Sequence, residues 1–145
     1  MHPEPDRLIR VPIFAKLTDE ERERVASWLD VEEHKPGTRL AHEGTTEYGF
    51  FVLDQGEARV DHDGHAVGRL GPGDVFGELA MLGDGHRRAD VVAVTEVRVF
   101  AMFGTRFREM QMSMPAVATA LQDLAEGRLI GLDAPGPDDG DANLT

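Results

Sequence analysis

Residues 75–94 read VFGELAMLGDGHRRADVVAV, and the rest of the chain can be organised around this stretch. Gly77 and Glu78 follow an apolar pair and open a short helical run over residues 79–82, whose first peptide N–H groups have no partner within the helix. Such a helix start carries partial positive charge, and Gly77 lets the backbone approach an anion closely. The carboxylate of Glu78 can accept a hydrogen bond from a sugar hydroxyl, and the guanidinium of Arg87 can bind two oxygens of one phosphate. The stretch therefore offers an anion site, a ribose acceptor and a phosphate clamp.

The run FGELAML at residues 76–82, followed by RRADV at 87–91, resembles the phosphate-binding cassette of cyclic nucleotide-binding domains. These domains occur in the protein kinase A regulatory subunit and in bacterial catabolite activator proteins, and their pattern reads F-G-E-L-A-L-(L/M), a short loop, then R-x-A-(T/S)-V. The resemblance implies that Glu78 binds the ribose 2′-hydroxyl and Arg87 the cyclic phosphate. It implies cyclic AMP as the simplest ligand, with cyclic GMP possible, and no prosthetic group. The ligand-binding residues it predicts are Gly77, Glu78, Leu79, Ala80, Arg87, Arg88 and Ala89.

Three positions depart from the family pattern, and the first is His86, where the family often has a proline before the arginine. Arg88 stands where the family has Ala, Ser or Thr, and Asp90 stands where it has Thr or Ser. If residues 89–94 form a strand, side chains alternate, so that Arg88 and Asp90 face away from Arg87 and Ala89. The favoured interpretation is an exposed ion pair on the outer face. The alternatives are that Asp90 faces the pocket and alters ligand choice, or that the loop is one residue longer and Arg88 is the clamp.

The composition limits the possible functions. The chain has 145 residues, a net charge of −12 and no cysteine. This length suits one domain, predicted over residues 1–132, and the acidic residues 133–145 are predicted to be a disordered tail. The absence of cysteine excludes disulfides and thiolate metal sites, and the acidic charge disfavours binding to DNA or to anionic membranes. No apolar run near the N-terminus is long enough for a signal peptide or a membrane span, so we expect a cytoplasmic protein.

The predicted fold class is mainly β with flanking helices, an antiparallel, jelly-roll-like β-roll over residues 31–102. Short apolar runs separated by turn residues carry this prediction. The expected strands are 31–35, 39–43, 50–54, 57–62, 66–70, 89–94 and 97–102.

Helices are predicted on the N-terminal side, within residues 8–30. Thr18 and Glu21 form a capping-box signature at the start of a helix over residues 19–29. The side chains expected to pack on the core are Ile9, Ile13, Phe14, Leu17, Val25, Trp28 and Leu29.

Helices are also predicted on the C-terminal side, within residues 105–130. Thr105 could cap a helix that carries Phe107, Met110 and Gln111, and Pro115 could start a second helix that runs to residue 130. In the family this last helix acts as a lid over the base, which makes Leu121, Leu124 and Arg128 candidate lid residues.

No catalytic or metal-binding constellation is recognised. A metal-binding cupin would need two histidines one residue apart, and His62 and His65 instead flank a predicted turn, outside the roll. We therefore expect a non-enzymatic receptor for a cyclic nucleotide that acts on a separate effector protein through its C-terminal helix. The alternative is a degenerate β-roll that serves as a protein-interaction module without binding nucleotide.

Overall fold

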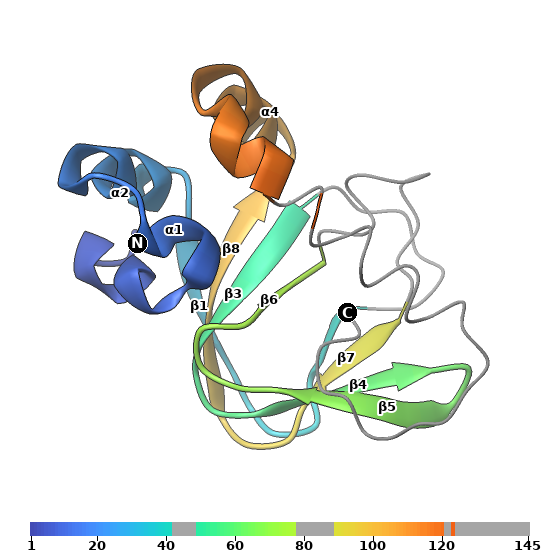
Figure 1. Ribbon diagram of the computed structural model, residues 1–145. Helices are drawn as coiled ribbons and strands as arrows, with labels where there is room; N and C mark the ends of the chain where they lie inside the picture. The colour runs from blue at the N-terminus through green and yellow to red at the C-terminus, as the bar shows by residue number, and fades with distance from the viewer. Residues whose placement is uncertain (42–48, 78–88, 121–122, 124–145) are drawn as a thin grey trace.

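Two antiparallel four-stranded sheets form the body of the protein (Figure 1). The structure is a computed structural model, and it describes residues 1–41, 49–77, 89–120 and 123. The first sheet has the order β1-β8-β3-β6 and the second the order β2-β7-β4-β5. The strands are β1 (Asp30–His34), β2 (Arg39–Ala41), β3 (Gly49–Gln55), β4 (Ala58–His62), β5 (His65–Leu70), β6 (Val75–Phe76), β7 (Asp90–Ala93) and β8 (Val97–Phe103).

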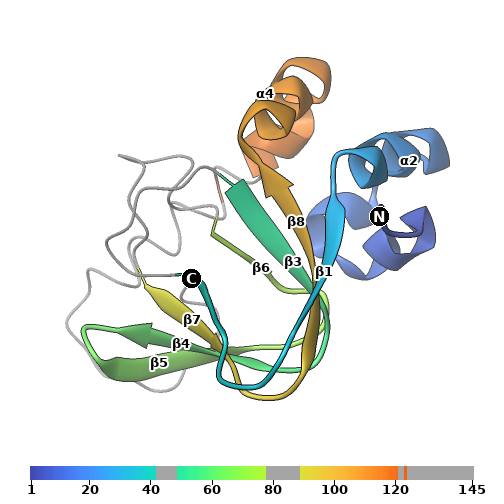
Figure 2. The ribbon, with the colours of Figure 1, turned by 180° about the vertical axis from the view of Figure 1, so that it is seen from behind.

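The helices in the described part of the chain lie against one of the two sheets. In Figures 1 and 2 the N-terminal helices and α4 (Gly104–Ser113) lie beside the sheet of β1, β8, β3 and β6, away from the sheet of β4, β5 and β7. The N-terminal elements are a 3-10 helix, η1 (Pro5–Arg10), and two α-helices, α1 (Pro12–Ala15) and α2 (Asp19–Ser27). Residues 115–120 are helical as well, so that Pro115 opens a helical segment as predicted.

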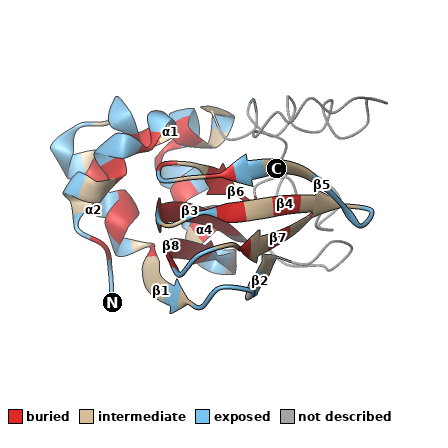
Figure 3. Ribbon diagram, turned by 90° about the horizontal axis from the view of Figure 1, so that it is seen from below, coloured by how far each residue is buried: buried red, intermediate tan, exposed pale blue. Residues whose placement is uncertain are grey.

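The alternation of side chains in β3 and β8 divides the interior into two apolar clusters. Phe50 and Val52 of β3 point to the helices and pack with Phe14, Val25 and Met110, among others. Their neighbours Phe51 and Leu53 point the other way and pack against the second sheet. Figure 3 shows the consequence: buried residues line the facing sides of helices and strands, while the outer sides of α1 and α2 are exposed.

The N-terminal helices follow from local signals. Thr18 caps α2 with both hydrogen bonds of the capping box, from the Glu21 N–H to the Thr18 hydroxyl and from the Thr18 N–H to the Glu21 carboxylate. Val25 and Leu29 are fully buried, and Trp28 is partly buried against the same cluster. Ile9, predicted to cover the core, is 48% exposed. A 3-10 helix has three residues per turn, so Leu8 and Val11 share its buried side and Ile9 does not.

Most predicted strands are present, with small shifts at their ends. Strand β7 begins at Asp90 and β8 extends to Phe103, while β6 is an additional strand of two residues. Because β8 leads straight into α4, the N-cap of that helix is Phe103, which makes no side-chain capping bond, and the prediction that Thr105 caps the helix is wrong. The helix carries Phe107, Met110 and Gln111, of which the first two are buried and Gln111 is exposed.

Candidate functional site

The predicted phosphate-binding stretch connects the two sheets. It leaves β6 of the first sheet at Gly77 and enters β7 of the second sheet at Ala89, on the side where the sheets diverge (Figure 1). Both end residues are buried, and Ala89 belongs to the same apolar cluster as Phe76. The fold therefore brings the two ends of this stretch to one interior region between the sheets.

Gly77 has a backbone conformation that favours glycine. Its φ is +93°, in the left-handed region that costs other L-residues about 1–2 kcal/mol. The sequence predicted glycine here for a close approach of the backbone to an anion, and the observed φ is a separate reason for glycine. The chain therefore makes a sharp change of direction directly after β6.

Of the predicted ligand-binding residues, the structure describes Gly77 and Ala89. Outside the described residues lie Glu78, Leu79, Ala80, Arg87 and Arg88, and also the candidate lid residues Leu121, Leu124 and Arg128. The roles assigned to these residues stay predictions.

A row of aromatic rings leads to Gly77 along the inner face of the first sheet. Phe51 stacks on Phe76 with a centroid distance of 5.0 Å, and Phe103 meets Phe51 edge to face at 5.8 Å. Phe103 is 43% exposed although its neighbours in the row are buried. Sequence reasoning missed Phe103 as a candidate apolar contact for a ligand. The signal was the alternation of Val97, Val99 and Ala101 in β8, which places residue 103 on the same face.

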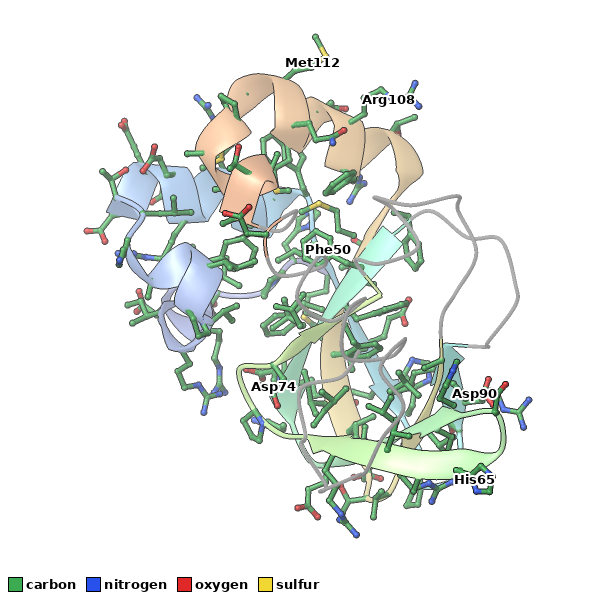
Figure 4. All side chains as sticks on the ribbon, turned by 45° about the vertical axis from the view of Figure 1, so that its right-hand side comes forward. Phe50, His65, Asp74, Asp90, Arg108 and Met112 are labelled. Atoms are coloured by element: carbon green, nitrogen blue, oxygen red, sulfur yellow. The ribbon has the colours of Figure 1, made fainter. Side chains whose placement is uncertain are left out.

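Asp90 lies on the outer face of the second sheet. Val91 and Ala93 of β7 are buried in the cluster between the sheets, and Asp90 alternates with them and is half-buried. The alternation predicted after the loop is therefore present from Ala89 onward. In Figure 4 Asp90 is found on this sheet, as is His65, which is exposed at the β4–β5 turn as predicted.

The cross-strand neighbour of Asp90 is another carboxylate, Asp61 of β4. Asp61 is bound by Arg59, with Nε–Oδ1 at 2.8 Å and Nη2–Oδ2 at 3.1 Å. This hydrogen bond, and then the charge of Asp61, raise the pKa of Arg59 above its ordinary value. Arg59 and Asp61 thus form an ion pair on β4, in which Asp61 is the cross-strand neighbour of Asp90.

Within the described residues, no group of three His, Cys, Asp or Glu side chains could hold a metal ion. The described helices also include none that is long and apolar enough to cross a bilayer.

The sequence matches the family described as the cyclic nucleotide-binding domain over residues 31–114. The chain belongs to this family. The match spans the strands β1 to β8 together with α4, and so includes both ends of the predicted phosphate-binding stretch.

Individual relatives of this cyclic nucleotide-binding domain are regulatory proteins. The cAMP-dependent protein kinase regulatory subunit of Colletotrichum orbiculare is 36% identical over 107 residues, which cover 72% of this chain and 27% of that protein. The chain thus matches about a quarter of the length of this kinase subunit.

Two solved structures have the same fold. The catabolite activator protein of Thermus thermophilus is 28% identical with a TM-score of 0.74, over 84% of this chain and 60% of that one. The regulatory subunit of a cAMP-independent protein kinase A from Trypanosoma brucei is 26% identical with a TM-score of 0.75, over 83% and 44%. Relatives with this fold therefore include proteins named for cAMP dependence and one named for cAMP independence.

Proposed function

We propose that this domain binds cyclic AMP in the stretch from Gly77 to Ala89 and that binding regulates a separate effector protein. One observation carries the proposal: Gly77, at the point where the motif needs the closest approach of backbone to phosphate, is buried with a φ of +93°. The family membership and the similarity to a cAMP-dependent kinase regulatory subunit support it. The degenerate β-roll without ligand is not favoured by these similarities, although one relative of the same fold is named as cAMP-independent.

The phosphate and the ribose of the nucleotide are each assigned contacts of their own. The peptide N–H groups at Leu79 and Ala80 and the guanidinium of Arg87 bind the cyclic phosphate. Glu78 accepts a hydrogen bond from the ribose 2′-hydroxyl. Ala89, small and buried, allows the ligand to lie close to the start of β7.

The base is assigned to the apolar side of the site. Phe103 offers a half-exposed ring at the end of β8, and Leu121, Leu124 and Arg128 are proposed to cover the base from the C-terminal segment. Cyclic GMP stays a possible ligand, because the position at which the family selects guanine is Arg88 here.

The proposed output is regulation of a partner, without catalysis by the domain itself. A receptor of this kind needs two conformations with different affinity for the nucleotide, so that binding shifts the balance between them. The relatives act as regulatory subunits, and the proposed partner is correspondingly a separate effector protein. The domain boundaries at residues 1–132, the acidic tail at 133–145, the absence of DNA and membrane binding, and the cytoplasmic location stay predictions.

Calorimetric titration with cyclic AMP, cyclic GMP and AMP tests the proposal. We expect cyclic AMP to bind more tightly than AMP, because AMP carries additional negative charge near Glu78 and lacks the rigid ring. Equal affinity for the two, or no binding of either cyclic nucleotide at micromolar protein, would contradict the proposal and favour the interaction module.

A further inference from the structure

An ion pair ties the N-terminal helices to β3, the strand that pairs with β6. Arg10, the last residue of η1, donates from Nη2 to Asp54 Oδ1 at 3.0 Å and to the Asp54 carbonyl oxygen at 3.3 Å. The two residues are 44 positions apart in the sequence. Asp54 lies at the irregularity of β3, between Leu53 and Gln55, where the register with β8 shifts.

The Asp54 carboxylate depends on Arg10. Its side chain is 2% exposed, and its Oδ2 has no hydrogen-bond partner in the part of the chain that the structure describes. A buried carboxylate with one unsatisfied oxygen loses its compensating charge if Arg10 is removed, and uncompensated buried charge is costly. Arg10 itself is half-exposed, but because Asp54 is buried, breaking this pair costs more than breaking a fully exposed one.

Arg10 also contacts the turn that precedes β6. A Cβ added to Gly73, which has a φ of +94°, would lie 2.7 Å from the Arg10 carbonyl oxygen, so only glycine permits this approach. The turn is fixed to β3 by two bonds of 2.8 Å, from the Gly73 N–H to the Leu53 carbonyl and from the Leu53 N–H to the Asp74 carbonyl. Asp74, which Figure 4 shows in this turn, also accepts the Gly71 N–H at 2.7 Å.

Strand β6 is short, and its core contacts are those of the buried Val75 and of Phe76, which stacks on Phe51. It has two residues, and their pairing is confined to Val75 with Val52 and Phe76 with Phe51. Gly77 follows directly. The stack holds Phe76, and the turn at residues 71–74, through its bonds to Leu53 and its contact with Arg10, sets how the chain enters β6 and so contributes to where Gly77 lies.

We propose that Arg10 and Asp54 are positioning residues through which the N-terminal helices set the place of Gly77 and hence the affinity of the phosphate-binding stretch. The link runs from η1 through the Pro72–Gly73 turn to β6. The part of this inference that concerns affinity rests on the proposed function, whereas the part that concerns the position of β6 does not.

Backbone hydrogen exchange tests the structural part. The variants are Arg10→Gln and Asp54→Asn, and the matched control is Arg7→Gln, because Arg7 lies in the same 3-10 helix and has no side-chain bond in the described residues. We expect faster exchange at residues 73–77 in both link variants, no change in the β4–β5 hairpin, and no change in the control. If the pair has a purely structural role, exchange should become faster uniformly over both sheets. Either that uniform increase or unchanged exchange at residues 73–77 would overturn the link.

Titration with cyclic AMP tests the functional part. Both link variants should bind cyclic AMP about two- to thirtyfold more weakly than the native protein does. This range is typical of substitutions that affect a binding site without contacting the ligand. The control variant Arg7→Gln should bind cyclic AMP with native affinity. Arg10→Lys keeps the charge and should recover part of the affinity; it replaces Arg10→Gln if that variant does not fold. Native affinity in Asp54→Asn would overturn the positioning role. If the native protein binds no cyclic nucleotide, the proposed function fails by itself and the exchange comparison still decides the link.

Discussion

Phe51 and Phe76 stack face to face across β3 and β6, with 5.0 Å between ring centroids and 17° between ring planes. The two residues are also direct partners in the strand register. This contact anchors the residue immediately before Gly77 to the centre of the first sheet. The geometry of the candidate site therefore depends on an aromatic pair in the core.

Phe76→Ala should destabilise the fold by about 3–5 kcal/mol, because a fully buried ring is removed and a cavity remains. The free energy of unfolding in urea measures this loss. Phe103→Ala is the matched control, since its ring is already half-exposed, and it should cost about 1 kcal/mol. Equal losses in the two variants would show that Phe76 is not the anchor described here.

Gly77→Ala should cost about 1–2 kcal/mol of stability through its left-handed backbone, and it should also weaken binding of cyclic AMP. Gly64→Ala provides the comparison. Gly64 has a φ of +79° at the β4–β5 turn, with no atom within 4 Å of an added Cβ. The two variants should lose similar stability, measured by thermal unfolding, but only Gly77→Ala should lose affinity. A loss of affinity in both would indicate a general effect of strain.

Asp90→Thr should leave the affinity for cyclic AMP unchanged at low and high salt. Asp90 lies on the outer face of the second sheet, beside Asp61, where solvent screens its charge. Titrations of the native protein and the variant at two salt concentrations check this. A gain of tenfold or more, largest at low salt, would mean that Asp90 acts on the bound phosphate and that the natural ligand is not an ordinary cyclic nucleotide.

The sequence predicted the strands well because turn residues separate them, and the turns determine where each apolar run ends. The glycines at 37, 56, 64 and 73 all have positive φ, as such turns require. The strand β6 was missed because two residues are too short to show any alternation. Ile9 was misassigned because the segment forms a 3-10 helix, whose buried side differs from that of an α-helix.

The candidate site was only partly predictable. The motif singled out Gly77 and Ala89 as ligand-binding residues, but it did not predict the left-handed backbone of Gly77. The link between Arg10 and Asp54 was not predictable, because it joins residues 44 positions apart and requires an irregularity in β3 that no local pattern marks. The contribution of Phe103 likewise depends on how far β8 extends.

The most direct test of the central claim is the affinity of three proteins for cyclic AMP: the native chain, Arg87→Ala and Arg88→Ala. Arg87 is proposed to bind the phosphate, so its removal should cost about 2–4 kcal/mol of binding, whereas removal of Arg88, which is predicted to be an exposed ion-pair partner, should cost less than about 1 kcal/mol. The reverse ranking would place the loop one residue out of register and make Arg88 the clamp. Unchanged affinity in both variants would contradict the claim that this stretch binds the nucleotide phosphate.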